Sequence, residues 1–497
     1  MRKSVNAITQ DAYDIPEVLD DTKNIKKFLM NNHGKKVIVV QGLGFVGAVM
    51  SLVCANSFEE EYAVIGIDLP NENTYWKIKS INDGIFPLIA DDPKIEEFFQ
   101  KSIKKGNFLA TYDPTAYQFA DVVIVDINLD VEKISESNRV LNDFNVDLTG
   151  FKSAIESIGQ NCKEDVLVLV ETTVPPGTSQ LVVKPILENE LLKRGLSSKK
   201  YKLGHSYERV MPGPEYIDSI REFPRVYSGL NKISADAIEA FLKTIIDSKK
   251  CELTRLEHTN ATEMAKVLEN SYRATNIAFA IEWSRFAEEA GVDLYSMVNA
   301  IRVRDTHSNL MFPGVGVGGY CLTKDPLLAS WARKSFFGSK SDLEMSVNSV
   351  SKNDQMPIFA FNRLVEVFGN LKGKKVAFLG VSYRGDVGDT RYTPVETLML
   401  KVREAQASIM LHDPYISFWQ EQECYVESNI DNIFNYSPEI LIISTGHKEY
   451  KNHETLQKIM AMNPIKIFDT IGLFSEDQIS VLQGKHSVSI LGRGDVN

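Results

Sequence analysis

The sequence predicts an α/β protein with two Rossmann-like, doubly wound domains joined by a long central helix and a helical region. In both halves of the 497-residue chain, short apolar runs alternate with helical stretches, a pattern typical of parallel sheets covered by helices. Between the halves, residues 260–290 have the pattern of one helix about 45 Å long, at roughly 1.5 Å per residue. We expect four segments: an N-terminal extension (1–34), a Rossmann domain (35–228), a helical region (229–350) and a second Rossmann-like domain (351–497).

Each domain has its own set of expected strands. Those of the first domain are Lys36–Val40, Ala63–Ile67, Val122–Ile127, Val166–Val170 and Arg209–Met211. In the second domain a strand–turn–helix unit begins at Lys374, and further strands are expected at Ser408–Leu411, Ile440–Ser444 and Ile465–Phe468.

The central helix has recognisable ends. Asn260 with Glu263 matches a capping box, and Gly291 is a natural stop. Its second half is apolar on more than one face, which predicts burial from two sides. We therefore expect a subunit interface there, in a homodimer or a larger homo-oligomer.

Composition restricts the class of protein. The formal net charge of −11 argues against a nucleic-acid partner, which favours a basic face. The five cysteines are scattered without metal-ligand spacing, and no secretory signal opens the chain, so we expect no metal and a cytoplasmic location. The apolar run Val37–Cys54 contains three glycines and Gln41, so it predicts strand, turn and helix, and we expect no membrane partner.

Gly42, Gly44 and Gly47 form a GxGxxG turn between the first predicted strand and a helix. In such a turn the first glycine bends the chain, the second admits a pyrophosphate and the third lets helix pack on strand. Asp68 follows 21 residues later at the end of the next strand, where a carboxylate binds ribose hydroxyls and repels a 2′-phosphate. The pattern predicts NAD rather than NADP; a tight turn without a ligand is the alternative.

The segment Gly314–Asp325 places a lone thiol, Cys321, in a glycine-rich loop with a carboxylate four residues on. The glycines expose backbone N–H groups and let the chain approach a ligand closely. This pattern fits a reactive nucleophile. It equally fits a turn beside a buried, inert cysteine, because thiol reactivity depends on exposure and pKa.

The segment Glu171–Thr178 follows an apolar strand, so its hydroxyls are expected at the ligand-binding edge of the sheet. A helix N-cap made by Thr178 or Ser179 is a second reading. In the second domain, Tyr383–Arg391 carries two arginines where the first domain has glycines. Since arginine binds phosphate in a bidentate manner, we expect a phosphorylated substrate there.

Three further polar residues are candidates for catalysis. Lys266 and Asn270 lie four residues apart on one helix face and together suit an oxyanion; a solvated face is the alternative. Glu208 is a candidate general base, although an ion pair with Arg209 also accounts for it.

Taken together, these segments resemble the UDP-glucose/GDP-mannose dehydrogenase family from about Lys35 onward. The matching motifs are Gly42–Gly47, Glu171–Thr178, Glu208–Gly213, Glu263–Asn270, Gly314–Asp325 and Tyr383–Arg391. The segment Glu208–Gly213 is similar to that of the branch that oxidises UDP-N-acetylhexosamines. The resemblance implies a four-electron oxidation of a sugar C6 alcohol to a carboxylate with two NAD⁺ in turn, for surface polysaccharide precursors.

The resemblance also implies roles for individual residues. Cys321 would form a thiohemiacetal and then a thioester, with Lys266 and Asn270 at the oxyanion. Asp325, near Lys266, would position water, and Glu208 and Thr173 would assist hydrolysis. Implied NAD contacts are Gly42, Gly44, Phe45, Val46, Gly47, Asp68, Glu171 and Thr172. Implied substrate contacts are Arg209, Gly318, Gly319, Tyr320, Tyr383, Arg384 and Arg391, with Arg304 reaching a neighbouring subunit.

Other readings stay open at this point. A UDP-glucose 6-dehydrogenase, a two-electron hydroxyacid dehydrogenase and a nucleotide sensor that has kept the fold are the alternatives. The sequence departs from the family's usual pattern at Tyr207, at Asp126–Leu129 and at Asp469–Gly472. The hexosamine itself is not determined by these residues.

Overall fold

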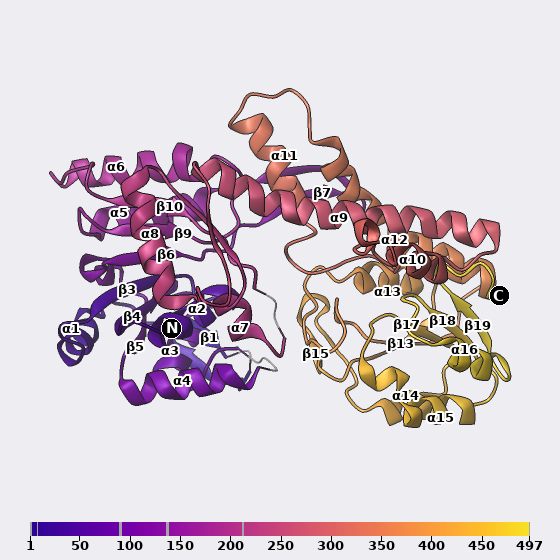
Figure 1. Ribbon diagram of the computed structural model, residues 1–497. Helices are drawn as coiled ribbons and strands as arrows, with labels where there is room; N and C mark the ends of the chain where they lie inside the picture. The colour runs from indigo at the N-terminus through magenta and orange to yellow at the C-terminus, as the bar shows by residue number, and fades with distance from the viewer. Residues whose placement is uncertain (1, 7, 89–91, 136–138, 211–212, 497) are drawn as a thin grey trace. The chain divides into compact units, whose positions relative to one another are not determined.

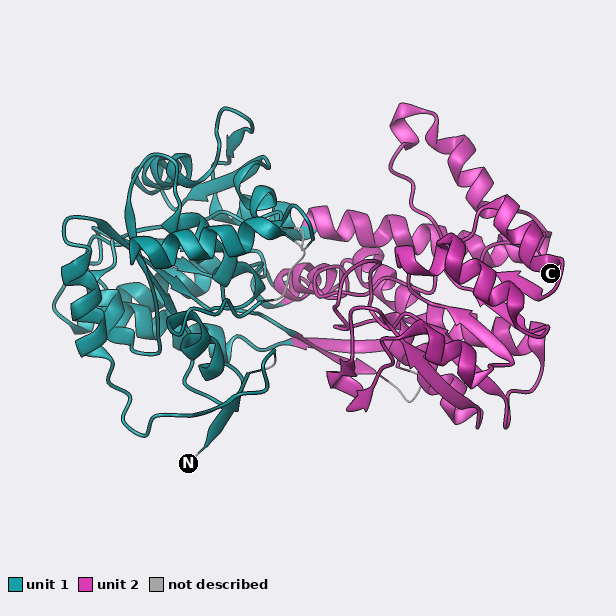
Figure 2. Cartoon of the chain, turned by 90° about the horizontal axis from the view of Figure 1, so that it is seen from below, with its two compact units in different colours: residues 1–130, 146–267, 335–338 teal, residues 131–145, 268–334, 339–497 magenta. Residues whose placement is uncertain are grey.

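The computed structural model describes residues 2–6, 8–88, 92–135, 139–210 and 213–496. The chain forms two compact units, coloured separately in Figure 2. The first contains residues 1–130, 146–267 and 335–338, and the second contains residues 131–145, 268–334 and 339–497. The predicted N-terminal extension is part of the first unit, and the predicted helical region is shared between both.

The first unit contains a sheet with the strand order β12-β11-β10-β9-β6-β3-β4-β5. Its strands are β3 (Lys36–Gln41), β4 (Tyr62–Ile67), β5 (Phe108–Thr111), β6 (Val122–Val125), β9 (Leu167–Val170), β10 (Lys202–His205), β11 (Arg225–Gly229) and β12 (Leu253–Arg255). From β5 to β10 neighbouring strands are parallel, while β11 runs antiparallel to β10. The order of the parallel strands is that of a dinucleotide-binding sheet, with its switch point between β3 and β6.

Helices cover this sheet, as Figure 1 shows. They are α1 (Thr22–Asn31), α2 (Phe45–Ala55), α3 (Tyr75–Asn82), α4 (Pro93–Lys105), α5 (Thr149–Asn161), α6 (Lys184–Lys193), α7 (Tyr216–Arg221) and α8 (Lys232–Ile245), with short turns η1 (Pro114–Phe119) and η2 (Ser179–Val183). One core joins α2, α4, α7 and α8 to strand residues such as Ile38, Val64 and Ile124. The predicted doubly wound fold of this half is confirmed.

One predicted strand of the first unit is wrong. The last parallel strand is β10, whereas Glu208 and Val210 lie in a loop. The Glu208 carboxylate accepts the N–H of Val210, and this local bond turns the backbone instead of extending it. Met211, the predicted end of the strand, lies outside the described residues.

The N-terminal residues fold onto the first sheet's β5 side. Strands β1 (Lys3–Val5) and β2 (Ala12–Asp14) pair antiparallel. Ser4 Oγ donates to the Glu72 carbonyl at 2.7 Å, in the loop that follows Asp68. Ile25 and Phe28 of α1 are buried. These residues therefore add a hydrophobic layer to the first unit.

The second unit contains a parallel sheet with the order β14-β13-β17-β18-β19. Its strands are β13 (Lys375–Leu379), β14 (Ser408–His412), β17 (Ile440–Ile443), β18 (Lys466–Asp469) and β19 (Ser487–Ile490). Alternate residues of β13 enter different cores, with Val376 and Phe378 on one side and Ala377 and Leu379 on the other. This order is the other common doubly wound arrangement, with its switch point between β13 and β17.

The remaining elements of the second unit are mostly helical. They are α10 (Leu294–Arg302), η3 (Asp305–His307), α11 (Asp325–Ser335), α12 (Glu344–Phe368), α13 (Pro394–Glu404), β15 (Phe418–Trp419), η4 (Gln420–Gln422), β16 (Cys424–Tyr425), α14 (Ile430–Tyr436), η5 (Lys448–Lys451), α15 (His453–Ala461) and α16 (Glu476–Gln483). The strands β7 (Val131–Ser135) and β8 (Leu141–Val146), which the sequence analysis missed, form a two-stranded sheet that belongs to this unit except for Val146.

The long helix α9 (Thr259–Ala290) is confirmed, but its predicted capping box is wrong. Glu263 does not fold back onto the start of α9. Its carboxylate accepts the N–H of Gly177 at 2.6 Å and that of Ser179 at 2.8 Å, at the beginning of η2. The predicted cap by Thr178 or Ser179 is therefore replaced by an acid from another helix, and the Thr178 hydroxyl donates to the Pro175 carbonyl.

Among the helices within the described residues, none is long and apolar enough to cross a membrane.

Candidate active site

The glycine turn after β3 has the geometry of a dinucleotide site. Gly42 has φ +100° and donates its N–H to the Ile67 carbonyl at 2.8 Å. A Cβ on Gly42 would lie 2.5 Å from the Asp126 carbonyl oxygen, and one on Gly47 would lie 1.9 Å from the Gly42 carbonyl oxygen. A Cβ on Gly44 would meet no atom within 4 Å. The first and third glycines are thus required by packing, and the second borders open space at the start of α2.

Asp68 lies directly beside this turn. Its Oδ2 accepts the N–H of Leu43 at 3.0 Å and its Oδ1 accepts that of Leu69 at 2.8 Å. Burial raises the pKa of Asp68, and Lys77 with the two N–H groups counteracts part of that rise. The acid is partly exposed. This arrangement fits NAD, with the pyrophosphate at the start of α2, beside Phe45 and Val46, and a ribose at Asp68.

Glu171 is buried beneath the edge of the sheet, with 1% of its surface exposed. It forms an ion pair with Arg225 from β11. Burial raises the pKa of Glu171 and, more strongly, that of Asp126, whose side chain lies 3.1 Å from the Cβ that Gly47 would carry. The neighbouring Thr172 donates its hydroxyl to the Ile127 carbonyl at 2.8 Å. Glu171 therefore holds the loop after β9 through its ion pair with Arg225. Its contact with NAD stays a prediction.

Lys266 and Glu208 come together within the first unit. Lys266 Nζ donates to the Glu208 carbonyl oxygen at 2.8 Å and lies 3.8 Å from Glu208 Oε1. The ammonium group also lies over the ring of Tyr207, 5.4 Å from its centroid. Lys266 is buried, so the alternative of a solvated face is wrong. Arg209 donates to the Pro224 carbonyl and to the Tyr207 hydroxyl. Thr173, three residues after the end of β9, is also buried.

The glycine-rich loop lies within the second unit, and its thiol is exposed. Val315 anchors the loop in the core. The Cys321 carbonyl accepts the N–H groups of Lys324 and Asp325 at 3.2 and 2.9 Å, which places the cysteine just before α11. The Thr323 hydroxyl closes this turn on the Gly319 carbonyl at 2.8 Å. The alternative of a buried cysteine is therefore wrong.

Asp325 forms the buried base of this loop. It has no exposed surface and accepts a hydrogen bond from Asn270 Nδ2 at 2.6 Å. Its second oxygen pairs with Lys324 Nζ at 3.0 Å. Lys324 also lies over the ring of Tyr320, 4.5 Å from its centroid. Asn270, one helical turn after Lys266 on α9, is therefore fixed by Asp325.

The loop after β13 packs directly on the glycine-rich loop. A Cβ on Gly318 would lie 2.6 Å from Tyr383 Cβ, and one on Gly319 would lie 2.8 Å from the Tyr383 ring. The Gly319 N–H donates to the Arg391 carbonyl at 3.0 Å. The Arg391 guanidinium pairs with Asp389 at 2.6 Å. Two motifs far apart in sequence thus form one surface.

The remaining predicted substrate residues lie on the surface of the second unit. Arg384 is exposed in the loop after β13. Arg304 is exposed just before η3. Tyr320 lies 6.0 Å from Tyr392, ring to ring.

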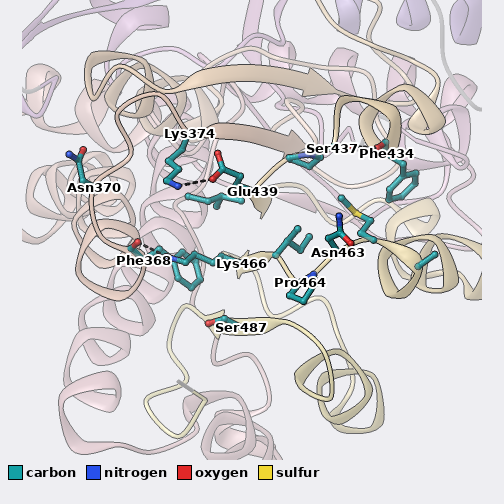
Figure 3. Close-up of a pocket in the computed structure, with 15 residues that line it drawn as sticks. Phe368, Asn370, Lys374, Phe434, Ser437, Glu439, Asn463, Pro464, Lys466 and Ser487 are labelled. Atoms are coloured by element: carbon teal, nitrogen blue, oxygen red, sulfur yellow. Dashed lines mark hydrogen bonds and ion pairs between the residues drawn. The ribbon is translucent and has the colours of Figure 1, made fainter.

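A cavity of about 700 Å³ lies elsewhere in the second unit, at the amino ends of β17, β18 and β19 (Figure 3). Its two lysines are already paired: Lys374 with Glu439 at 2.7 Å, and Lys466 Nζ with the Phe368 carbonyl at 2.6 Å. Ligands of parallel sheets bind at the carboxyl ends, where the candidate residues lie. This cavity is therefore not the active site.

Sequence reasoning missed several residues that shape the site. Tyr207 was read as a departure from a pattern, yet it covers Lys266. Glu263 and Asn353 each hold a loop through contacts between distant segments. No local pattern marks such residues, because their partners lie elsewhere in the chain.

Three features indicate a dehydrogenase with a separate substrate domain. They are the glycine turn with Asp68, the glycine-rich loop with the exposed Cys321, and the second doubly wound sheet. Models of the UDP-glucose/GDP-mannose dehydrogenase family match residues 36–246 (NAD binding domain), 260–351 (central domain) and 377–476 (UDP binding domain). The chain belongs to this family, and it is an NAD-dependent nucleotide-sugar dehydrogenase. Family membership sets aside the hydroxyacid dehydrogenase and the nucleotide sensor.

Similar proteins cover nearly the whole chain. The UDP-N-acetyl-D-mannosamine dehydrogenase of Pyrococcus horikoshii is 29% identical over 471 residues, 92% of this chain and all of that protein. The crystal structure of NDP-N-acetyl-D-galactosaminuronic acid dehydrogenase from Methanosarcina mazei Go1 is 26% identical, with a TM-score of 0.75 over 95% of this chain and 98% of that one. The structure of a UDP-D-ManNAc dehydrogenase from Pyrococcus horikoshii is also 26% identical, with a TM-score of 0.76 over 93% and 100%.

Proposed function

We propose that this enzyme oxidises the C6 alcohol of a UDP-N-acetylhexosamine to the uronic acid through a covalent intermediate on Cys321. The observation that carries the proposal is the exposed thiol on a loop packed against Tyr383 and Arg391. Relatives that oxidise N-acetylhexosamine nucleotides support the choice of sugar. UDP-glucose remains the second candidate.

The residues suit a two-stage oxidation. NAD supplies the hydride acceptor for each stage when it is bound at the turn of the first unit. In the first stage the C6 alcohol loses a proton and a hydride and becomes an aldehyde. The Cys321 thiolate adds to the aldehyde to give a thiohemiacetal, which loses a second hydride to become a thioester. Water then releases the carboxylate and restores the thiol.

The buried polar residues have distinct tasks in this scheme. Lys266 and the Asn270 amide stabilise the oxyanion of the tetrahedral centre. Glu208 and Thr173 orient the water that attacks the thioester. Asp325 holds Asn270 in place through their 2.6 Å hydrogen bond. Arg384 and Arg391 bind the diphosphate in the second unit.

We further propose a homodimer, or a larger homo-oligomer, located in the cytoplasm. The support for the oligomer is a row of large apolar side chains along α9 that are about half exposed: Leu268, Tyr272, Phe279, Trp283 and Phe286. A patch of this kind marks an interaction surface. The double variant Phe279→Glu, Phe286→Glu is expected to have the molar mass of a monomer in sedimentation or light-scattering experiments. A monomeric molar mass of the wild type would contradict the proposal.

A panel of nucleotide sugars tests the function. Purified enzyme with NAD⁺ is mixed with UDP-GlcNAc, UDP-ManNAc, UDP-GalNAc or UDP-glucose, and NADH absorbance and product mass are followed. One N-acetylhexosamine should yield two NADH per sugar and a product 14 mass units heavier, roughly the change from CH₂OH to COOH. Turnover of UDP-glucose alone would contradict the sugar assignment, and no turnover of any would contradict the reaction.

A further inference from the structure

We infer that Asn353 is a positioning residue that clamps the glycine-rich loop and thereby sets the place of Cys321. Asn353 lies on α12, 32 residues after the thiol in sequence. Its side chain binds both backbone groups of one loop residue: Oδ1 accepts the Val317 N–H at 2.6 Å, and Nδ2 donates to the Val317 carbonyl at 2.8 Å. The inference rests on the proposed function only where catalysis is the readout.

The Asn353 side chain is buried, and both its oxygen and its nitrogen bond to Val317. Asn353 exposes 7% of its surface. A primary amide is the only side-chain group that combines a strong donor and a strong acceptor in this spacing. It therefore binds Val317 as a neighbouring β-strand would. Loss of either bond would leave a partly buried backbone group of the loop without this partner, which costs stability.

The backbone of α12 is adapted to the same contact. Pro357 lies inside the helix, four residues after Asn353. Because proline has no N–H, it cannot donate the helical bond to the Asn353 carbonyl. That carbonyl would lie 3.4 Å from a Cβ on Gly316, and Oδ1 would lie 3.2 Å from it. Gly316, with φ +123°, is thus required by both backbone conformation and space.

The clamp is placed between two fixed points of the loop. On one side Val315 is buried in the core of the second unit. On the other side Gly319 is bonded to the Arg391 carbonyl. Asn353 fixes Val317, which lies midway between them and four residues before the thiol. Without it, the segment between the core anchor and the substrate loop gains freedom, and reactive geometry is lost steeply with small displacements.

The test compares Asn353→Ala and Asn353→Asp with Asn362→Ala. Asn362 is an exposed residue on the same helix, so its variant controls for the substitution itself. Hydrogen exchange of peptides covering residues 311–322 reports on the clamp directly, and alkylation of Cys321 by iodoacetamide reports on the thiol. Steady-state kinetics with NAD⁺ and the best nucleotide sugar separate kcat from KM.

We expect exchange at residues 315–320 to rise at least tenfold in Asn353→Ala, with a changed alkylation rate of Cys321. We also expect kcat to fall about tenfold or more, with KM for NAD⁺ within twofold. Asn353→Asp keeps the acceptor and loses the donor, so its values should lie between those of wild type and Asn353→Ala, and it serves as the test if the alanine variant does not fold.

Two results would overturn the inference. One is wild-type exchange of the loop in both Asn353 variants. The other is a rise in exchange spread evenly over the second unit, with the alkylation rate of Cys321 unchanged, which would mean a general loss of stability. Exchange and alkylation do not depend on turnover, so failure of the proposed reaction, seen as full activity of Cys321→Ser, remains distinguishable from failure of the clamp.

Discussion

The two sheets of this enzyme share a backbone device at their carboxyl edges. In the first unit Gly42, with φ +100°, donates its N–H to the carbonyl that ends the neighbouring strand β4, at 2.8 Å. In the second unit Gly380, with φ +99°, donates in the same way to the end of β14, also at 2.8 Å. In both, the following residue donates to an aspartate: Leu43 to Asp68 and Val381 to Asp413.

The two aspartates differ in what else they bind. Asp413 has no exposed surface, and its Oδ2 accepts bonds from the Ser382 N–H, the Ser382 hydroxyl and His447 Nε2 at 3.0, 2.8 and 3.1 Å. The Asp386 N–H donates to His447 Nδ1, so the ring proton lies on Nε2. Asp68 is partly exposed beside the open space at Gly44.

This difference explains how one fold serves two tasks. The acid that the protein satisfies internally holds a loop, whereas the acid that keeps an exposed side can receive ribose hydroxyls. In the first unit the helix begins at Phe45, three residues after the glycine, and in the second it begins at Pro394. The longer loop of the second unit carries Tyr383 and Arg391 to the glycine-rich loop.

The largest expected effect separates the chemistry of the second unit from the binding of NAD by the first. Cys321→Ser should lower kcat by about 1,000-fold or more, because the covalent step is lost. The yield of two NADH per sugar should disappear, while the Kd of NAD⁺ stays within about twofold, roughly 0.4 kcal/mol. Cys424→Ser, at a half-buried cysteine of the same unit, is the control. Complete oxidation at a near-normal rate would rule out the nucleophile.

The second effect breaks the structural acid. Asp413→Ala should lower the free energy of unfolding by about 3 kcal/mol or more, because buried donors of Val381, Ser382 and His447 lose their acceptor. Urea unfolding followed by fluorescence measures it. Any variant that remains folded should bind NAD⁺ as the wild type does. A stability loss below about 1 kcal/mol would refute the assignment of Asp413 as scaffold.

A third acid sharpens the comparison through pH. Burial raises the pKa of Glu263 to about 7 from 4.5, whereas burial of Asp413 is outweighed by bonds from His447 and backbone N–H groups, which lower its pKa. Because the folded state binds the Glu263 proton more tightly, that contribution to stability is complete below pH 4.5 and is lost as the pH rises to about 7. The difference of about 2.5 pKa units corresponds to about 3 kcal/mol.

Glu263→Gln removes this titration. The stability of the wild type relative to the variant should therefore decline by up to about 3 kcal/mol between pH 5 and pH 8, in urea unfolding at each pH. Parallel stability curves for the two proteins across this range would contradict the raised pKa.

The smallest effect concerns the ligand-binding acid. Asp68→Ala should raise the Kd of NAD⁺ about 10- to 100-fold, which matches the loss of charged hydrogen bonds worth roughly 1.5–3 kcal/mol. Discrimination against NADP⁺ should fall because the repelling charge is gone. Calorimetry with both dinucleotides checks this, and unfolding stability should change by less than about 1 kcal/mol. Unchanged NAD⁺ affinity would place the ribose elsewhere.

Much of the fold could be predicted because its signals are local. The run Lys36–Gln41 and the glycines behind it dictate strand, turn and helix within a few residues. The strands β7 and β8 were not predicted, because apolar residues such as Leu141 and Phe144 stand three apart, which does not match the period of two of a strand. Lys133 of β7 also pairs with Asp354 of α12, far away in the sequence. Glu263 was misread for the same reason, since its partners lie some 85 residues earlier.

The sequence by itself determined the α/β class, the dinucleotide turn with Asp68, and the presence of a thiol in a glycine-rich loop. Tertiary structure decided that Cys321 is exposed, that Lys266 and Asn270 are buried, and that Glu171 pairs with Arg225. It also decided that Asn353 holds the loop. The physical reason is that backbone conformation follows from neighbours in sequence, whereas exposure and the partner of a buried polar group follow from segments that meet only after folding.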